Sequence, residues 1–115
     1  MFKSKKLSKF SNISHGFFNQ SGGVSKGIYK SLNCGLGSND KQIDIQKNLK
    51  IVKDKISKKS SNIFLVKQVH GNKFVYLKKN LKVKNRNINA DAIITKKKTL
   101  PIGVLTADCV PLLAY

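Results

Sequence analysis

The sequence predicts an α/β fold in which one amphipathic helix is combined with several short strands. Residues 41–57 have the periodicity of a helix with a single apolar face. Residues 62–70, 74–77, 90–95 and 102–107 have the length and apolar content of strands. Hydrophobic residues make up 40% of the 115 residues, a composition typical of a globular chain. We therefore expect one α/β domain, or part of one.

The N-terminal third is expected to be mostly irregular. Residues 1–11 form a basic arm, and residues 12–115 belong to one domain. A short strand is plausible over residues 13–18. The glycine-rich stretch over residues 20–37 has no periodic pattern, which is typical of a functional loop.

The helix over residues 41–57 is the clearest element of the sequence. Asp40 precedes it as a plausible N-cap, and Asp44 lies in its first turn, where a negative charge suits the helix dipole. The apolar positions recur at intervals of four, three and four residues and so share one face, which is formed by Ile45, Leu49, Val52 and Ile56.

A strand over residues 62–70 follows the helix. One of its faces changes from apolar to polar at Gln68 and His70, so we expect these two residues at the rim of a core. Residues 74–77 are predicted to be a partner strand, joined to the first by a tight hairpin at Gly71.

Short strands continue to the end of the sequence. A lysine- and asparagine-rich loop is expected over residues 81–89, followed by a strand over residues 90–95. The strand over residues 102–107 is expected to be buried. Residues 111–115 should begin a further strand.

The net charge of +18 raises the question of a nucleic-acid partner. The charge comes from 22 Lys and one Arg, Arg86, spread along the whole chain. Arg is the residue expected wherever phosphates are gripped by paired hydrogen bonds, so the pattern favours solvated surface lysines over a specific nucleic-acid site. No run is long enough to span a membrane, and the two cysteines do not form a disulfide framework. We expect a cytoplasmic protein with free thiols.

His70 and Cys109 are the candidate chemical groups, because each closes an apolar run. They could supply two of the three protein ligands of a catalytic zinc site. They could equally act as base and nucleophile, since both arrangements need a deprotonated Cys beside an imidazole. Asp108 could orient Cys109 or only cap the end of a strand.

Other candidates have simpler explanations. His15 is expected to be a hydrogen-bonded structural residue, and Cys34 a packed thiol. The loop at residues 22–25 could cradle a phosphate, although it lacks the signature of a P-loop. Asp91 could serve the site or merely cap a loop.

Several short motifs together resemble the YfiH-type laccase-domain family, also called multicopper polyphenol oxidase family proteins or purine nucleoside phosphorylases. They occur in the family's order with close to its spacing. The matching segments are His15-Gly16-Phe17-Phe18, Gly22-Gly23-Val24-Ser25, Ser31-Leu32-Asn33, the helix start over residues 40–48, Gln68-Val69-His70-Gly71, Ala90-Asp91-Ala92 and Thr106-Ala107-Asp108-Cys109.

The resemblance implies a metal-dependent enzyme, usually with zinc rather than copper. Its ligands would be His70, Cys109 and a second His from a downstream motif that is absent from this chain. It also implies an αββα-like sandwich of mixed sheets layered with helices, incomplete here because the chain would be an N-terminal portion of one catalytic domain. A multicopper oxidase needs many histidines, and this sequence has two.

The implied reaction is phosphorolysis of adenosine, inosine or methylthioadenosine to the base and a sugar 1-phosphate, with adenosine deaminase activity as well. Its partners would be a small-molecule purine nucleoside and phosphate. The residues expected to bind substrate are Ser25, Asn33, Gln68 and Asp91. The family commonly has Arg where Gln20 stands, which weakens the case for anion binding at that loop.

Two other functions fit the residues. A cysteine hydrolase or amidase would use Cys109 as nucleophile with His70, and would remain active after chelation. A small basic nucleic-acid-binding module would need neither residue, and its binding would depend steeply on salt. The 115-residue chain by itself is expected to be inactive.

Overall fold

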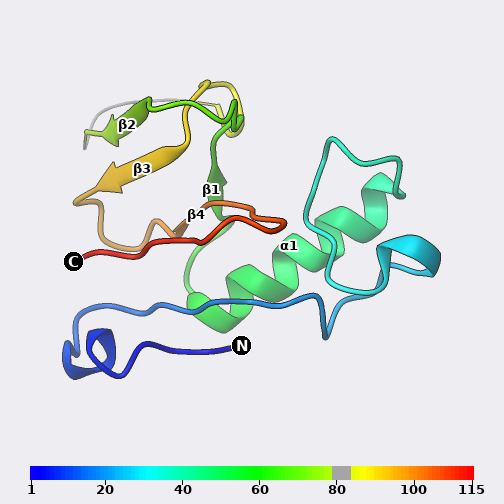
Figure 1. Ribbon diagram of the computed structural model, residues 1–115. Coiled ribbons are helices and arrows are strands. Elements are labelled where there is room, and N and C mark those ends of the chain that lie inside the picture. Colours follow the sequence, from blue (N-terminus) through cyan, green and yellow to red (C-terminus); the bar gives the residue numbers. More distant parts are fainter. Residues whose placement is uncertain (79–83) are drawn as a thin grey trace. The chain divides into compact units, whose positions relative to one another are not determined.

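A computed structural model describes residues 1–78 and 84–115 of the chain (Figure 1). It forms two compact units, Met1–Lys58 with Tyr115 and Lys59–Ala114, which are described separately below. Among the described residues, no helix is long and apolar enough to cross a membrane. The elements are two 3-10 helices, Leu7–Lys9 and Gly27–Tyr29, the helix α1, Gln42–Ile56, and the strands β1, Phe64–Leu65, β2, Phe74–Leu77, β3, Ala92–Thr95, and β4, Ile102–Gly103.

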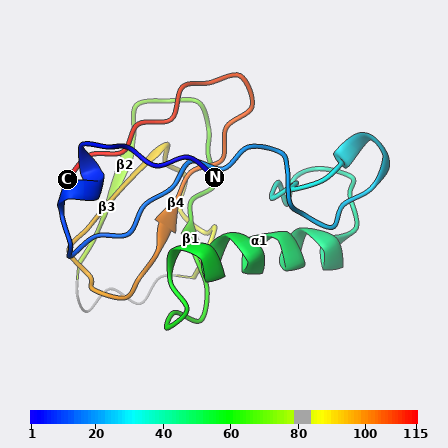
Figure 2. The same ribbon diagram turned by 90° about the horizontal axis from the view of Figure 1, so that it is seen from below.

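The first unit is built around α1, which confirms the predicted helix. Ile45 is fully buried and Val52 is buried, while Leu49 and Ile56 are half-buried, as the periodicity requires. Figures 1 and 2 both show the irregular loop that precedes α1 lying beside the first half of the helix. The loop before α1 therefore packs against a helix of the same unit.

The predicted N-cap is wrong, although Asp44 lies in the first turn as expected. The N-cap residue is Lys41, and no side chain caps the helix. Asp40 instead accepts the Lys41 N–H at Oδ1, at 2.8 Å, and the Asn33 amide at Oδ2, at 3.0 Å. Its carboxylate is thus held by the preceding loop and by the next peptide, and does not reach the first turn.

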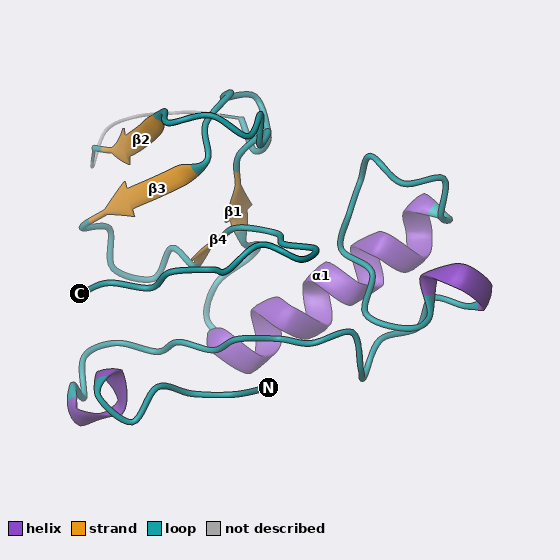
Figure 3. Ribbon diagram, in the orientation of Figure 1, coloured by secondary structure: helices purple, strands orange, loops and turns teal. Residues whose placement is uncertain are grey.

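The second unit contains two small parallel pairs, so the α/β class is confirmed (Figure 3). β1 pairs with β4, and β2 pairs with β3 over four residues in register. The predicted hairpin between the first strand and β2 is wrong, because β2 takes β3 as its partner. The buried core consists of Phe64, Val66, Leu77 and Ala90, with Val75, Ile88, Ile93, Leu100 and Ile102 packed against it.

Several strands are shorter than predicted because side chains replace part of the backbone ladder. Asn85 accepts the Leu65 N–H at 2.7 Å and donates to the Ile63 carbonyl at 2.9 Å, taking the place of a neighbouring strand. The segment over residues 104–107, predicted as strand, is irregular and only partly buried. Of the predicted loop 81–89, residues 81–83 lie outside the described residues.

The two outermost strand predictions are also wrong. Residues 13–18 form no strand and contribute only a single antiparallel bridge between Phe2 and Phe17. Residues 111–115 have no regular structure. Each segment lacks a partner among the described residues that would continue a ladder, and alternating hydrophobicity cannot supply one.

Candidate functional site

The segments that carry His70 and Cys109 follow two paired strands of the second unit. β1 leads into the Gln68-Val69-His70-Gly71 motif, and β4 leads into Thr106-Ala107-Asp108-Cys109. Because β1 and β4 are parallel, both motifs leave the same, carboxyl edge of the pair. Ligands of open α/β sheets bind at that edge. The two predicted site residues therefore belong to one edge of one unit.

Gln68 joins the two segments directly. Its Nε2 donates to the Leu105 carbonyl, and its Oε1 accepts the Leu105 N–H, each at 2.8 Å. The Gln68 side-chain amide thus exchanges two hydrogen bonds with the backbone of Leu105, as two backbone residues do in a hydrogen-bonded pair of antiparallel strands. Gln68 precedes His70 by two positions, and Leu105 precedes Cys109 by four. These two hydrogen bonds, called the joint below, therefore connect the two segments shortly before His70 and Cys109.

Asp91 organises the turn that contains His70. Its Oδ1 accepts the N–H groups of Val69, at 3.0 Å, and His70, at 2.9 Å, while its Oδ2 accepts that of Gly71, at 2.8 Å. These donors, Gly71 first, hold the pKa of Asp91 below its usual value despite the opposing effect of desolvation. The carboxylate is thus kept charged while it holds the turn.

Both motifs contain a non-glycine residue in the left-handed region of backbone conformation. His70 has φ 55° and Asp108 has φ 70°. Such a conformation costs about 1–2 kcal/mol for most residues, so the surrounding contacts must hold it. At His70 those contacts include the Asp91 carboxylate. Arg86 and Thr99, outside the two motifs, share this conformation, so it does not by itself mark the site.

The side chains of His70 and Cys109 are both exposed. An imidazole nitrogen and a thiolate sulfur are preferred zinc ligands, so these two donors fit the metal that the resemblance implies. A catalytic zinc site needs a third protein ligand. Over residues 1–78 and 84–115, no group of three or more His, Cys, Asp or Glu side chains could hold a metal ion.

The other predicted substrate residues, Ser25 and Asn33, lie in the first unit. Their polar atoms are engaged by the loop and by α1. Asn33 donates to Asp40 at 3.0 Å and to Ser38 at 2.9 Å, and accepts the Gly35 N–H at 3.0 Å. The Ser25 hydroxyl, ahead of Asn33, is the main cause that lowers the pKa of Asp40.

Asn48 is the central residue of this loop, and sequence reasoning missed its role. Its side chain is fully buried. Its Oδ1 accepts the Val24 N–H at 2.8 Å, and its Nδ2 donates to Ser25 Oγ at 2.9 Å and to the carbonyls of Ser31, at 3.2 Å, and Asn33, at 2.8 Å. The available signal was its position between Ile45 and Val52 on the apolar face, where an amide needs buried partners.

His15 and the glycine loop have structural contacts. His15 Nε2 accepts the Ser4 N–H at 2.9 Å, which confirms the expected hydrogen-bonded role. At Gly23, an added Cβ would stand 2.2 Å from the Ser31 carbonyl oxygen. The two sides of the loop are also joined by backbone hydrogen bonds. The Gln20 carbonyl oxygen accepts the N–H groups of Ser31, at 3.1 Å, and Leu32, at 2.7 Å. Cys34 is half-buried.

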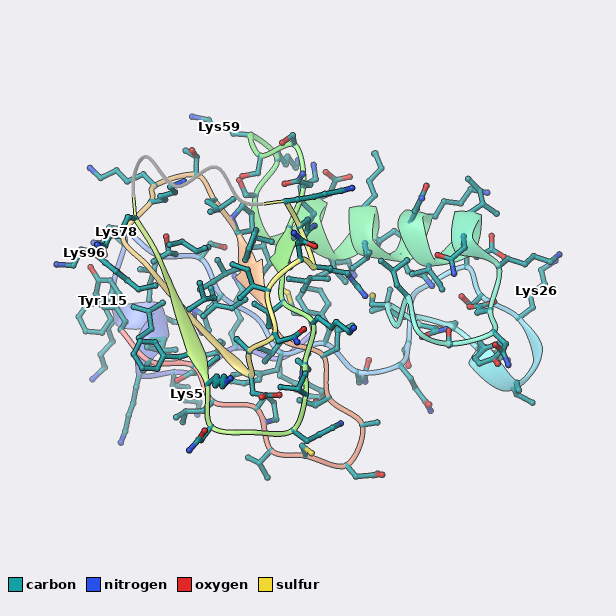
Figure 4. All side chains as sticks on the ribbon, turned by 90° about the horizontal axis from the view of Figure 1, so that it is seen from above. Lys5, Lys26, Lys59, Lys78, Lys96 and Tyr115 are labelled. Atoms are coloured by element: carbon teal, nitrogen blue, oxygen red, sulfur yellow. The ribbon has the colours of Figure 1, made fainter. Side chains whose placement is uncertain are left out.

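Two lysines of the second unit, Lys78 and Lys96, lie together where two paired strands end. Lys78 and Lys96 follow the paired ends of β2 and β3, and Figure 4 shows them close together and well away from Lys59. Each is an exposed side chain.

Comparison with known proteins relates the chain to one group of enzymes. A purine nucleoside phosphorylase of Bacteroides thetaiotaomicron is 30% identical over 115 residues, covering 95% of this chain and 43% of that protein. Purine nucleoside phosphorylase YlmD of Bacillus subtilis is 31% identical over 106 residues, covering 87% and 38%. A purine nucleoside phosphorylase of Corynebacterium glutamicum is 30% identical over 98 residues, covering 84% and 39%. The chain thus spans about two fifths of the length of these curated relatives.

The family comparison covers nearly the whole sequence, including all of the motifs described above. The pattern that matches is described as multi-copper polyphenol oxidoreductase laccase, and it extends over residues 14–115. The chain therefore belongs to the multi-copper polyphenol oxidoreductase laccase family.

Proposed function

We propose that this chain is part of a metal-dependent purine nucleoside phosphorylase. The substrates are adenosine, inosine or methylthioadenosine with phosphate, the products are the base and a sugar 1-phosphate, and deamination of adenosine is a second activity. One structural observation supports this most: the motifs of His70 and Cys109 leave the same edge of a parallel pair and are joined through Gln68 and Leu105. The names of the curated relatives supply the reaction class.

His70 and Cys109 are proposed as the protein ligands that this chain contributes to a zinc ion. When bound, zinc would supply Lewis-acid polarisation and activate an oxygen nucleophile near neutral pH. The chain's part is to present an imidazole and a thiolate at one strand edge, with the turn of His70 held by Asp91. The same two residues would be the catalytic ones.

Substrate binding is proposed to involve the loop that Ser25 and Asn33 hold. The Ser25 side chain is engaged by α1 and the Asn33 side chain by the loop, so their contribution would come through the shape of the loop backbone. Because this chain has Gln20 where the family commonly has Arg, phosphate would have to find its cation elsewhere in the protein.

The wider setting belongs to the same proposal. The small parallel pairs would lie within an αββα-like sandwich in the complete catalytic domain, of which residues 12–115 form the N-terminal portion. The ligands would be a nucleoside and phosphate in the cytoplasm, with no specific nucleic-acid or membrane partner.

The test uses the full-length gene product. Release of base from each nucleoside is measured by chromatography with and without phosphate, and bound zinc is measured on the same samples. Cys109→Ala and His70→Ala should each lower turnover at least about 100-fold and should lose zinc together. Cys34→Ala is the matched control, because it removes a half-buried thiol from the first unit, and it should retain both.

Other outcomes separate the alternatives. Unchanged phosphorolysis by Cys109→Ala would contradict the assignment. Hydrolytic activity that survives chelation but requires Cys109 would indicate a cysteine hydrolase. Nucleic-acid binding that falls steeply with salt and survives both substitutions would indicate a basic binding module.

A further inference from the structure

Both polar atoms of the Gln68 side chain bond to one residue of the other motif segment, and each atom keeps one further hydrogen-bonding position. Its amide oxygen and amide nitrogen both bond to the peptide groups of Leu105, each at 2.8 Å. The side chain is half-buried, with its two bonds running to backbone. A side chain bound in this way positions the chain, because turning the amide away from Leu105 would break the joint between the two motifs.

The side chain of Asp91 is likewise hydrogen-bonded to backbone groups, here those of the His70 turn. Its two oxygens accept three consecutive N–H groups, those of residues 69–71. Its own backbone is fixed, since the Asp91 N–H donates to the Lys73 carbonyl at 2.9 Å, immediately before β2. Asp91 therefore links the starts of β2 and β3 to the connection that follows β1.

We propose that Gln68 and Asp91 are positioning residues, which set the backbone from which His70 and Cys109 project and do not contact substrate. Gln68 fixes the distance between the two motif segments, and Asp91 fixes the left-handed turn at His70. This inference rests on the proposed function only for its kinetic consequences. Its structural content can be tested whatever the reaction proves to be.

The first measurement is amide hydrogen exchange in the metal-free, full-length protein. In Asp91→Asn the new NH2 group faces a backbone N–H, so the amides of residues 69–71 should exchange about tenfold faster, while those of α1 stay unchanged. Asp44→Asn is the matched control, because it removes a carboxylate from the first turn of α1 in the other unit. It should leave residues 69–71 as they are.

The second measurement is zinc affinity, with kinetics alongside. Loss of a partner that orients a ligand commonly weakens metal binding about 10- to 100-fold, which is the effect expected for Asp91→Asn. Gln68→Leu should give the same direction and should also expose the Leu105 amide to exchange. Gln46→Leu, on an exposed position of α1, is its control. In both test variants kcat should fall while KM for the nucleoside stays within about twofold.

Asp91→Glu keeps the charge and both acceptor oxygens, so it should recover part of the exchange protection and of the zinc affinity lost in Asp91→Asn. If Asp91→Asn does not fold, the same measurements on Asp91→Glu and Gln68→Leu decide the matter. A raised KM with unchanged exchange and zinc affinity would overturn the inference and make these residues substrate contacts. If the wild-type protein shows no phosphorolysis, the proposed function fails, while exchange and zinc binding still test the positioning role.

Discussion

An irregular segment is held by hydrogen bonds from one side chain in each unit, an amide in the first unit and a carboxylate in the second. In each, one side chain supplies the hydrogen bonds that an irregular segment cannot make for itself. In the first unit the neutral amide of Asn48, fully buried, serves both N–H and carbonyl groups of the loop before α1. In the second unit the half-buried carboxylate of Asp91 accepts three N–H groups around His70.

The difference indicates what each centre is for. A buried amide with donors and acceptors satisfied is costly to disturb and insensitive to pH, which suits a permanent structural joint. A carboxylate at a partly exposed turn holds that turn while the neighbouring side chains remain open to solvent. We therefore expect substitutions of Asn48 to lower mainly the free energy of unfolding, and substitutions of Asp91 to lower mainly zinc affinity and turnover.

The largest expected effect is that of Asn48→Leu. It leaves the Val24 N–H and the carbonyls of Ser31 and Asn33 without their buried partner, which should lower the free energy of unfolding by about 3 kcal/mol. Urea denaturation of the full-length protein followed by circular dichroism measures it. A loss below about 0.5 kcal/mol would show that the loop is not held by this residue.

A smaller effect is expected for Gly23→Ala. The new Cβ would stand 2.2 Å from the Ser31 carbonyl oxygen and 2.5 Å from Asn48 Oδ1, so the loop must shift at a cost of about 1–3 kcal/mol. Gly37→Ala is the matched control, because nothing lies within 4 Å of its added Cβ. Equal stability of the two variants would contradict the close packing of this loop against α1.

The smallest expected effect is a dependence of stability on pH. Hydrogen bonds from Ser25, then from Asn33 and the Lys41 N–H, hold the pKa of Asp40 below the usual 3.8. In the folded protein the group therefore stays charged at pH values where the unfolded chain binds a proton. Its contribution is present above about pH 4 and disappears as pH falls through the lower folded pKa.

Asp40→Asn should flatten this part of the acid unfolding curve, measured by fluorescence or circular dichroism between about pH 5 and 2. Asn48→Leu should lower stability also above about pH 5, where Asp40 is charged in both the folded and the unfolded chain, since Asn48 does not titrate. Identical slopes for the wild type and Asp40→Asn would show that the hydrogen bonds to this carboxylate do not contribute to stability.

Local patterns in the sequence predicted the elements better than their pairing. The helical spacing of Ile45 and Val52 located α1, and the apolar runs located β2 and β3 nearly to the residue. The parallel pairing of β2 with β3 could not be predicted, because it depends on partners about twenty residues apart with no turn signal between them. The strand over residues 62–70 was predicted too long because the amides of Asn85 and Gln68 replace its ladder.

For the candidate site too, the residues could be predicted from the sequence, while the hydrogen bonds that position them could not. The types of His70 and Cys109 made them candidates, and the ordered motifs around them singled them out; the parallel pair places their motifs at one edge. The bonds that Gln68 and Asp91 make could not be predicted, since their partners are backbone groups 37 and about 20 residues away. Backbone partners leave no trace in residue type, so only coordinates show them.

The joint between Gln68 and Leu105 has a consequence for how such proteins vary. One half of it is a particular side chain, while the other half is a peptide group, which every residue except proline carries in full. By itself, this joint would exclude proline from position 105 and would place no other demand on the side chain there. A position can be indispensable to the geometry of a protein and yet look unconstrained when its sequences are compared.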